Sequence, residues 1–229
     1  SGEVKNSFKR LPLHAIRSLS GQIGMVLIFI SLKVLPLSDA TILRSLTPLF
    51  VPLLAAYWLK ERLSWVLIPS FILAFAGVWM LSGMDKPHFS MLSFLPIIAG
   101  IFVAMAMVAI RRVSKVAGGA EIVFYFSLTG IFFSLGMAAF TEFTLPSSLA
   151  VWGMVLLMGF FGSLGQIWVT KANQIADASI LAPFYYLNAV FGAILSHFFW
   201  NETLGIWGWL GATLVISAGL LLIFFKKRS

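Results

Sequence analysis

Arg44 is the residue whose type and position most directly suggest chemistry, because it lies inside a long apolar stretch. A charged side chain in hydrocarbon costs several kcal/mol unless it pairs, reaches the interface or faces water. An Arg44 that faces a cavity would bind a carboxylate or phosphate group. An Arg44 that extends to the outer interface, with Asp39 as its partner, would act only as an anchor. The sequence favours neither interpretation over the other.

Two tyrosines and an amide form a second group suited to binding. Tyr185, Tyr186 and Asn188 follow Pro183 in an apolar stretch. Proline removes a backbone hydrogen bond and opens a helix locally, which exposes carbonyl groups toward a cavity. Aromatic rings and an amide at such a break can stack on and orient a flat or zwitterionic ligand. Ordinary packing between helices explains the same residues equally well.

Polar residues and prolines also interrupt two other apolar stretches. Pro48 and Pro52 predict a kink that matches the one at Pro183, and Thr47 lies beside it. Gln166 and Trp168 are candidates to reach the same cavity from a neighbouring helix. We therefore predict one polar cavity near mid-membrane, whose substrate-binding residues are Arg44, Thr47, Gln166, Trp168, Tyr185, Tyr186 and Asn188.

The sequence lacks the residue clusters that an enzyme or a metal site needs. It has no cysteine, no HExxH or GxSxG motif and no metal-ligand spacing among its three histidines. Glu61 and Glu202 each follow the end of a long apolar stretch, where structural pairing with a neighbouring helix end is favoured over catalysis. We predict that the chain is not an enzyme and has no catalytic residue, metal or cofactor.

Membrane helices must position these residues, because the sequence is too apolar for a water-facing surface. Of its 229 residues, 60% are hydrophobic and 10% charged, with a mean hydropathy of +0.98, whereas soluble domains carry about 25% charged residues. Crossing a bilayer takes about 20 apolar residues. The sequence predicts an all-α polytopic membrane protein with eight spans, at residues 14–35, 39–59, 65–83, 91–110, 120–140, 149–172, 179–200 and 204–225.

The basic residues predict how these spans are oriented. Most of the 16 Lys and Arg residues fall on one side of the predicted membrane, and Arg17 is counted there as a residue before the first span. The positive-inside rule then places both ends of the chain in the cytoplasm of a bacterial-type inner membrane. The net charge of +8 is explained by this asymmetry, and we predict a lipid bilayer and no nucleic acid as partner.

An internal repeat predicts how the helices are related. Residues 21–63 align with residues 162–204 without gaps, at an offset of 141 residues, and the matches include Gly21 with Gly162 and Glu61 with Glu202. The offset shifts the second span onto the seventh. Because five helices is an odd shift, the two copies must lie upside down relative to each other, as inverted repeats do in secondary transporters.

Short motifs at corresponding positions carry a family resemblance. Residues 35–40 read LPLSDA, 47–50 TPLF and 59–63 LKERL, and their counterparts are Gly165-Gln166, 182–187 (APFYYL) and 201–204 (NETL). In order and spacing this pattern resembles the EamA-like branch of the drug/metabolite transporter superfamily. The resemblance implies ten helices in two inverted five-helix units around a central cavity, here lacking the first two helices. Residues 1–83 would be the remainder of the first unit and 91–229 the second, in which Ala189 replaces a frequent proline.

Together these features predict a secondary transporter that works by alternating access. Positive charge and aromatic rings in the predicted cavity favour a small anionic or zwitterionic metabolite, such as an amino acid or its derivative. A nucleoside-bearing metabolite such as S-adenosylmethionine is the alternative substrate. A non-transporting structural subunit and an intramembrane enzyme are the alternatives of another class, and a homodimer is compatible with the sequence.

Overall fold

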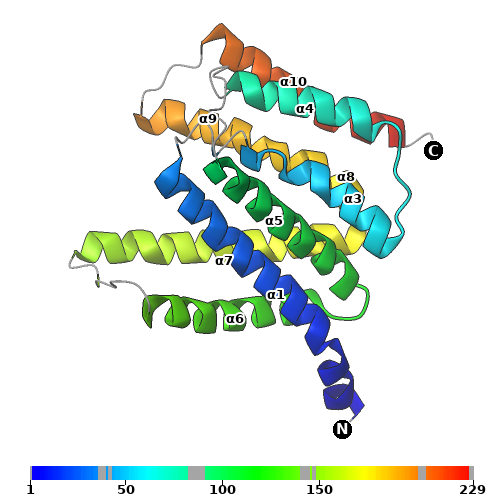
Figure 1. The fold of residues 1–229 in the computed structure, drawn as a ribbon, viewed down its shortest axis with the longest axis vertical. Helices are drawn as coiled ribbons and strands as arrows, with labels where there is room; N and C mark the ends of the chain where they lie inside the picture. The colour runs from blue at the N-terminus through cyan, green and yellow to red at the C-terminus, as the bar shows by residue number, and fades with distance from the viewer. Residues whose placement is uncertain are drawn as a thin grey trace.

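The computed structural model describes residues 2–35, 40, 43–81, 91–139, 145, 148–200 and 205–226, and every regular element within them is helical. The helices run back and forth, and both chain ends lie toward the right of Figure 1. The elements are α1 (Gly2–Val34), α3 (Thr47–Leu59), α4 (Leu67–Leu81), η1 (Met91–Ser93), α5 (Phe94–Val113), α6 (Gly119–Ala139), α7 (Leu149–Ile175), α8 (Ala178–Leu181), η2 (Ala182–Tyr186), α9 (Leu187–Trp200) and α10 (Ile206–Lys226).

Each predicted span overlaps a described helix, and the bounds differ most in the first span. Helix α1 begins at Gly2 rather than at residue 14, and it continues through Pro12. The sequence interpretation treated the basic residues 5–10 as a loop. Lys and Arg are nearly as good helix formers as Leu, so basic character before a span does not end the helix.

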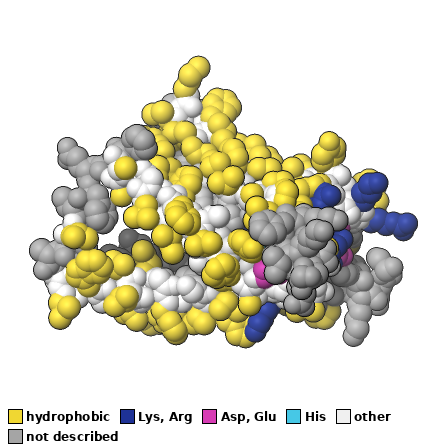
Figure 2. Space-filling view, turned by 90° about the horizontal axis from the view of Figure 1, so that it is seen from below, with side chains coloured by type: hydrophobic (Ala, Val, Ile, Leu, Met, Phe, Trp, Pro, Cys, Tyr) yellow, Lys and Arg dark blue, Asp and Glu magenta, His cyan; other side chains and the backbone are white. Residues whose placement is uncertain are grey.

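The described helices make the chain a multi-pass membrane protein. Four of them are long and apolar enough to cross a membrane, at Arg10–Val34, Met91–Val113, Gly119–Ala139 and Leu149–Ile175, and three shorter apolar helices occupy Thr47–Leu59, Leu67–Met80 and Ile206–Leu221. Large apolar side chains such as Phe132 and Met158 are exposed on α6 and α7. Hydrophobic side chains cover most of the face in Figure 2 that belongs to the described residues. Lipid, not water, suits such a surface.

Two close contacts between helices depend on glycine. Helix α1 packs on α5, and α4 packs on α10. A Cβ atom on Gly24 of α1 would lie 2.8 Å from Cγ2 of Val103, and one on Gly77 of α4 would lie 2.6 Å from the carbonyl oxygen of Gly211. Small residues let membrane helices approach to such distances.

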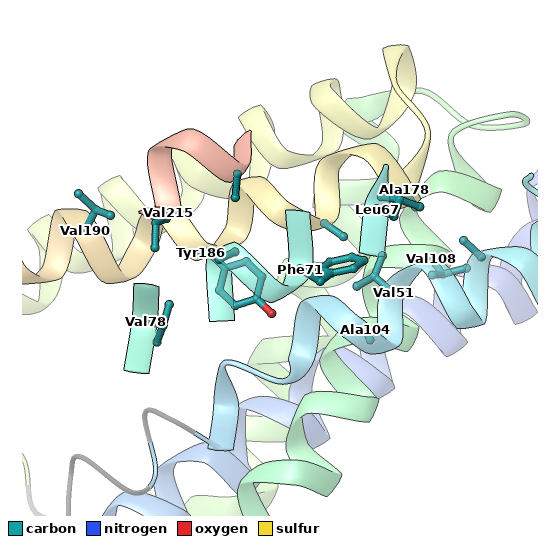
Figure 3. Close-up of a cluster of buried hydrophobic side chains, with 14 of the residues drawn as sticks. Val51, Leu67, Phe71, Val78, Ala104, Val108, Ala178, Tyr186, Val190 and Val215 are labelled. Atoms are coloured by element: carbon teal, nitrogen blue, oxygen red, sulfur yellow. The ribbon is translucent and has the colours of Figure 1, made fainter. Parts of the chain in front are cut away.

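The largest buried cluster surrounds the 3-10 segment η2. It brings together Val51 of α3, Phe71 of α4, Val108 of α5, Tyr186 of η2 and Val215 of α10. Figure 3 shows the Tyr186 ring between Val78 and Phe71. This packing fixes η2 against helices from both halves of the chain.

Candidate functional site

Two helices are interrupted at positions that the repeat relates. Helix α3 begins at Thr47 after a turn at residues 45–46, and 141 residues later η2 gives way to α9 at residues 186–187. A proline lies near each break: Pro48 in the first turn of α3 and Pro183 in the first turn of η2. Proline fits a first turn because its missing N–H has no helical partner there. Helix α3 continues through Pro52, so the predicted kink lies before Pro48 and not at Pro52.

A polar cavity of about 180 Å³ lies between these two breaks. Its lining residues come from both halves of the chain: Arg44, Ser45, Thr47, Pro48, Val78, Val103, Met107, Tyr185, Tyr186 and Asn188. Five of the seven predicted substrate-binding residues, namely Arg44, Thr47, Tyr185, Tyr186 and Asn188, therefore line one cavity.

The polar groups of this cavity are incompletely satisfied. The Arg44 side chain is exposed, and no carboxylate of a described residue lies within ion-pair distance of it. Asp39, the partner that the anchor interpretation requires, lies outside the described residues. The Tyr186 hydroxyl is buried and has no hydrogen-bond partner among the described residues. Because buried hydroxyls in proteins are nearly always hydrogen-bonded, this one is available to a bound molecule.

Gln166 and Trp168, the other two predicted substrate-binding residues, are not among the residues that line this cavity. Oε1 of Gln166 accepts a hydrogen bond of 2.6 Å from Nη2 of Arg17. Trp168 is 66% exposed on the outer face of α7, and its ring lies 5.1 Å from the Nζ atom of Lys171. Successive residues of an α-helix point about 100° apart, so residues two positions apart face nearly opposite directions.

Arg17 and His14 are buried polar residues whose position the sequence interpretation missed. Arg17 is 3% exposed, and its Cζ atom lies 3.7 Å from the centroid of the Phe126 ring. His14 is 2% exposed, stacks on Tyr125 with ring centroids 4.5 Å apart, and has Nε2 3.3 Å from Oε1 of Glu121. Both side chains lie between α1 and α6.

The spacing of basic residues and glycines along α1 could have predicted that His14 and Arg17 are buried. Arg10, His14, Arg17, Gly21 and Gly24 recur at steps of four, three, four and three residues. Such steps put all five on one face of a helix. Because the glycines on that face pack against a neighbouring helix, His14 and Arg17 on the same face are buried as well, whereas Arg10 is partly exposed.

Glu61 joins the ends of helices from both halves of the chain. Its Oε1 atom accepts a hydrogen bond of 3.4 Å from the backbone N–H of Ala178 and lies 3.9 Å from Nε of Arg111. Arg111 also places Nη2 2.7 Å from Oδ1 of Asp177 and donates from Nη1 to the carbonyl oxygen of Asn173 at 2.8 Å. Glu202, the other acidic residue predicted to be structural, lies outside the described residues.

The arrangement suits the binding of a small polar molecule. Within the described ranges, no group of three His, Cys, Asp or Glu residues could hold a metal ion. The cavity combines a cation, two phenol rings, a hydroxyl and an amide, which are groups that bind a polar organic molecule without attacking it.

Comparison with known proteins decides the family. Residues 3–83 and 90–225 match the model of the EamA-like transporter family. The chain belongs to this family. It is 29% identical over 228 residues to the pseudopaline exporter CntI of Pseudomonas aeruginosa, a match that covers 98% of this chain and 79% of the exporter. It is 30% identical over 230 residues to the S-adenosylmethionine uptake transporter of Rickettsia prowazekii, covering 98% and 76% of the two chains.

A solved crystal structure supports the fold independently. Its sequence is 19% identical to that of this chain, and the two structures superpose with a TM-score of 0.78. The match covers 94% of this chain and 76% of the chain in the crystal structure. The chain is therefore a membrane transporter of the drug/metabolite superfamily that acts on a small molecule. The prediction that it is not an enzyme is confirmed by its family and by the relatives named above.

Proposed function

We propose that this protein transports a small anionic or zwitterionic organic metabolite, most simply an amino acid or an amino-acid derivative, by alternating access through the cavity between the two helix breaks. One observation carries the proposal. A cavity lined from both halves of the chain holds an arginine without a described carboxylate partner and a buried tyrosine hydroxyl without a described hydrogen-bond partner.

The lining residues suit the binding of a carboxylate. Arg44 offers a planar fork of N–H donors that matches a carboxylate in two hydrogen bonds. Thr47 and Asn188 line the same cavity, and Asn188 offers both a donor and an acceptor for an ammonium or amide group. The volume of 180 Å³ is below the range of about 300–1,000 Å³ typical of sites for drug-sized ligands. This size favours a small metabolite.

Inverted repeats around the cavity would provide the two access states. We propose eight spans that form two related units, residues 1–83 and 91–229, within a ten-helix plan. The paired breaks at residues 45–46 and 186–187 support this relation. Gly21 and Gly24 pack against other helices, whereas their counterparts Gly162 and Gly165 meet none of the described residues, as expected if a further helix covers them.

We propose that the protein lies in a bacterial inner membrane with both chain ends in the cytoplasm. The Lys and Arg side chains visible in Figure 2 lie mainly toward the right of the view, where Figure 1 has both chain ends. Basic residues concentrate on the cytoplasmic side of bacterial inner-membrane proteins. The Glu61–Arg111–Asp177 contacts would then close the cytoplasmic end of the cavity.

A nucleoside-bearing substrate is the second candidate, and the names of several relatives favour it. Transporters of S-adenosylmethionine from Rickettsia species are 27–30% identical over nearly the whole chain. Tyr185 and Tyr186 supply rings on which a base could stack. Such a molecule is larger than an amino acid, so this candidate requires a wider cavity in another access state.

Binding and transport by purified protein test the proposal and separate the two candidates. Amino acids and nucleosides would be screened by thermal shift, because a ligand of the folded state raises the melting temperature. Uptake of each hit would then be measured in sealed proteoliposomes with wild-type protein and with Arg44→Ala.

We expect Arg44→Ala to weaken affinity about ten- to a hundredfold, because a charge-assisted hydrogen bond contributes roughly 1.5–3 kcal/mol and each 1.4 kcal/mol is a factor of ten. Arg44→Lys should recover part of this loss, since a point charge replaces the planar fork. Wild-type affinity in folded Arg44→Ala would contradict the proposed site and leave Arg44 as a membrane anchor.

A further inference from the structure

Arg17 is a second buried cation, located in a helix long and apolar enough to cross a membrane, and no ion pair with a described carboxylate balances its charge. Its side chain is 3% exposed within a helix that crosses the membrane. No carboxylate of a described residue lies within 4.0 Å of it, and its Nε atom is buried without a described hydrogen-bond partner. Arginine does not deprotonate in proteins, so the guanidinium stays charged. A buried charge of this kind is strongly unfavourable until an anion meets it.

The present partners of Arg17 are neutral. One hydrogen bond of 2.6 Å runs from Nη2 to Oε1 of Gln166, and the ring of Phe126 covers one face of the guanidinium. Nε and Nη2 form one edge of the guanidinium fork, the edge that a carboxylate binds with two parallel hydrogen bonds. The amide oxygen of Gln166 therefore occupies the Nη2 half of an edge that a carboxylate could fill. The Nε half has no hydrogen-bond partner among the described residues.

Local packing directs the Arg17 side chain along α1 toward the middle of that helix. Nη1 lies 3.1 Å from the position that a Cβ atom on Gly21 would take, so the side chain extends along α1 toward its centre. The glycine leaves the room that the guanidinium uses. The same face of α1 places Gly24 against Val103, and Val103 lines the cavity together with Arg44. Arg17 therefore lies on the helix face that adjoins the cavity.

We infer that Arg17 is a second anion-binding group of the transport site, and that the substrate carries two anionic groups, one held by Arg44 and the other by Arg17. This inference rests on the proposed function. Binding of the second group replaces the hydrogen bond from Arg17 to Gln166. Because Arg17 lies on α1 and Gln166 on α7, the exchange also releases a contact between the two halves of the chain.

The test uses matched pairs of probes that differ in one negative charge: L-glutamate with L-glutamine, L-aspartate with L-asparagine, and succinate with succinamate. Affinities would be measured by thermal shift on the purified full chain, with wild type, Arg17→Gln and Gln166→Glu. Lys115→Gln removes an exposed cation from a loop and serves as the control for net charge.

We expect wild-type protein and Lys115→Gln to bind the acid of at least one pair about ten- to a hundredfold more tightly than its amide. Arg17→Gln should bind both members alike, with the affinity for the amide unchanged. Gln166→Glu should also lose the preference, because its own carboxylate then occupies Arg17. This variant adds an ion pair, so it answers the question if Arg17→Gln fails to fold.

The other outcomes contradict either the second anion site alone or the proposed function together with it. If wild type binds acid and amide alike, or if the variants keep the preference, the second anion site is refuted while the proposed function stands. If no probe and no hit of the metabolite screen binds wild type, the proposed function fails, and the inference fails with it.

Discussion

Arg111 offers the sharpest test of how the closed end of the cavity is held. The residue connects the end of α5 to the end of α7 and to Asp177, and Glu61 lies beside it. Arg111→Ala removes two hydrogen bonds to backbone carbonyl oxygens, at 2.8 and 3.1 Å, and the ion pair with Asp177. If this end closes the cavity, the variant should shift the protein toward the state that is open on the same side.

The size of the shift follows from the exposure of each contact. Asp177 has a side chain that is 45% exposed, so its ion pair contributes at most about 1 kcal/mol. The hydrogen bond from the charged donor to Asn173 is partly buried and is worth about 1 kcal/mol, whereas the one to Gln174 is exposed and is worth about 0.5 kcal/mol. A total of about 1.5–2.5 kcal/mol corresponds to a change of about 10- to 60-fold in the ratio of the two states.

The chain has no cysteine, so a single introduced cysteine reports access without interference. Met107→Cys places the label in the cavity wall, and a membrane-impermeant thiol reagent would be applied from the cytoplasmic side. Labelling should be much faster in Arg111→Ala than in the parent. Arg112→Ala is the matched control, because its guanidinium lies 5.0 Å over the Trp58 ring at the same helix end. Equal labelling rates in all three proteins would refute the closing role of Arg111.

Two further predictions concern packing and topology. Gly24→Ala should lower stability by about 1–3 kcal/mol in a thermal melt in detergent, because its Cβ would lie 2.8 Å from Val103 and 3.2 Å from the carbonyl oxygen of Ala99. Gly162→Ala is the control at the repeat-related position, where no described atom lies within 4 Å of the added Cβ. This control should melt at the wild-type temperature. Cysteines at positions 86 and 142 should label from outside the cell and a cysteine at Lys115 should not, since the charge asymmetry places that loop in the cytoplasm; efficient outside labelling at Lys115 would reverse the orientation.

The helices were predictable because the bilayer sets their length and composition. The convergence of Arg44, Thr47 and Tyr185 on one cavity was predictable for a different reason, namely the prolines at repeat-related positions. Gln166 and Trp168 were assigned to the cavity from their depth in the membrane, without regard to the direction in which each side chain points. Two residues that lie two positions apart on one helix cannot both face the same cavity.

Counting Lys and Arg residues could not predict that Arg17 is buried. The positive-inside rule sums Lys and Arg near the ends of a span, and it treats each of them as a flanking residue. Arg17, Arg111 and Arg112 all lie toward one end of the bundle, yet their partners differ: a neutral amide and Phe126, a carboxylate with backbone carbonyls, and Trp58.

These partners give the three arginines different roles. The guanidinium that meets a carboxylate is already neutralised, so it holds helix ends together. The one over Trp58 keeps its charge near the surface, where the charge orients the chain. Only Arg17 is both buried and paired with neutral groups, which leaves its charge for a ligand. For a basic residue in a membrane helix, sharing a face with tightly packed glycines therefore indicates its function better than the distance of that residue from the helix end does.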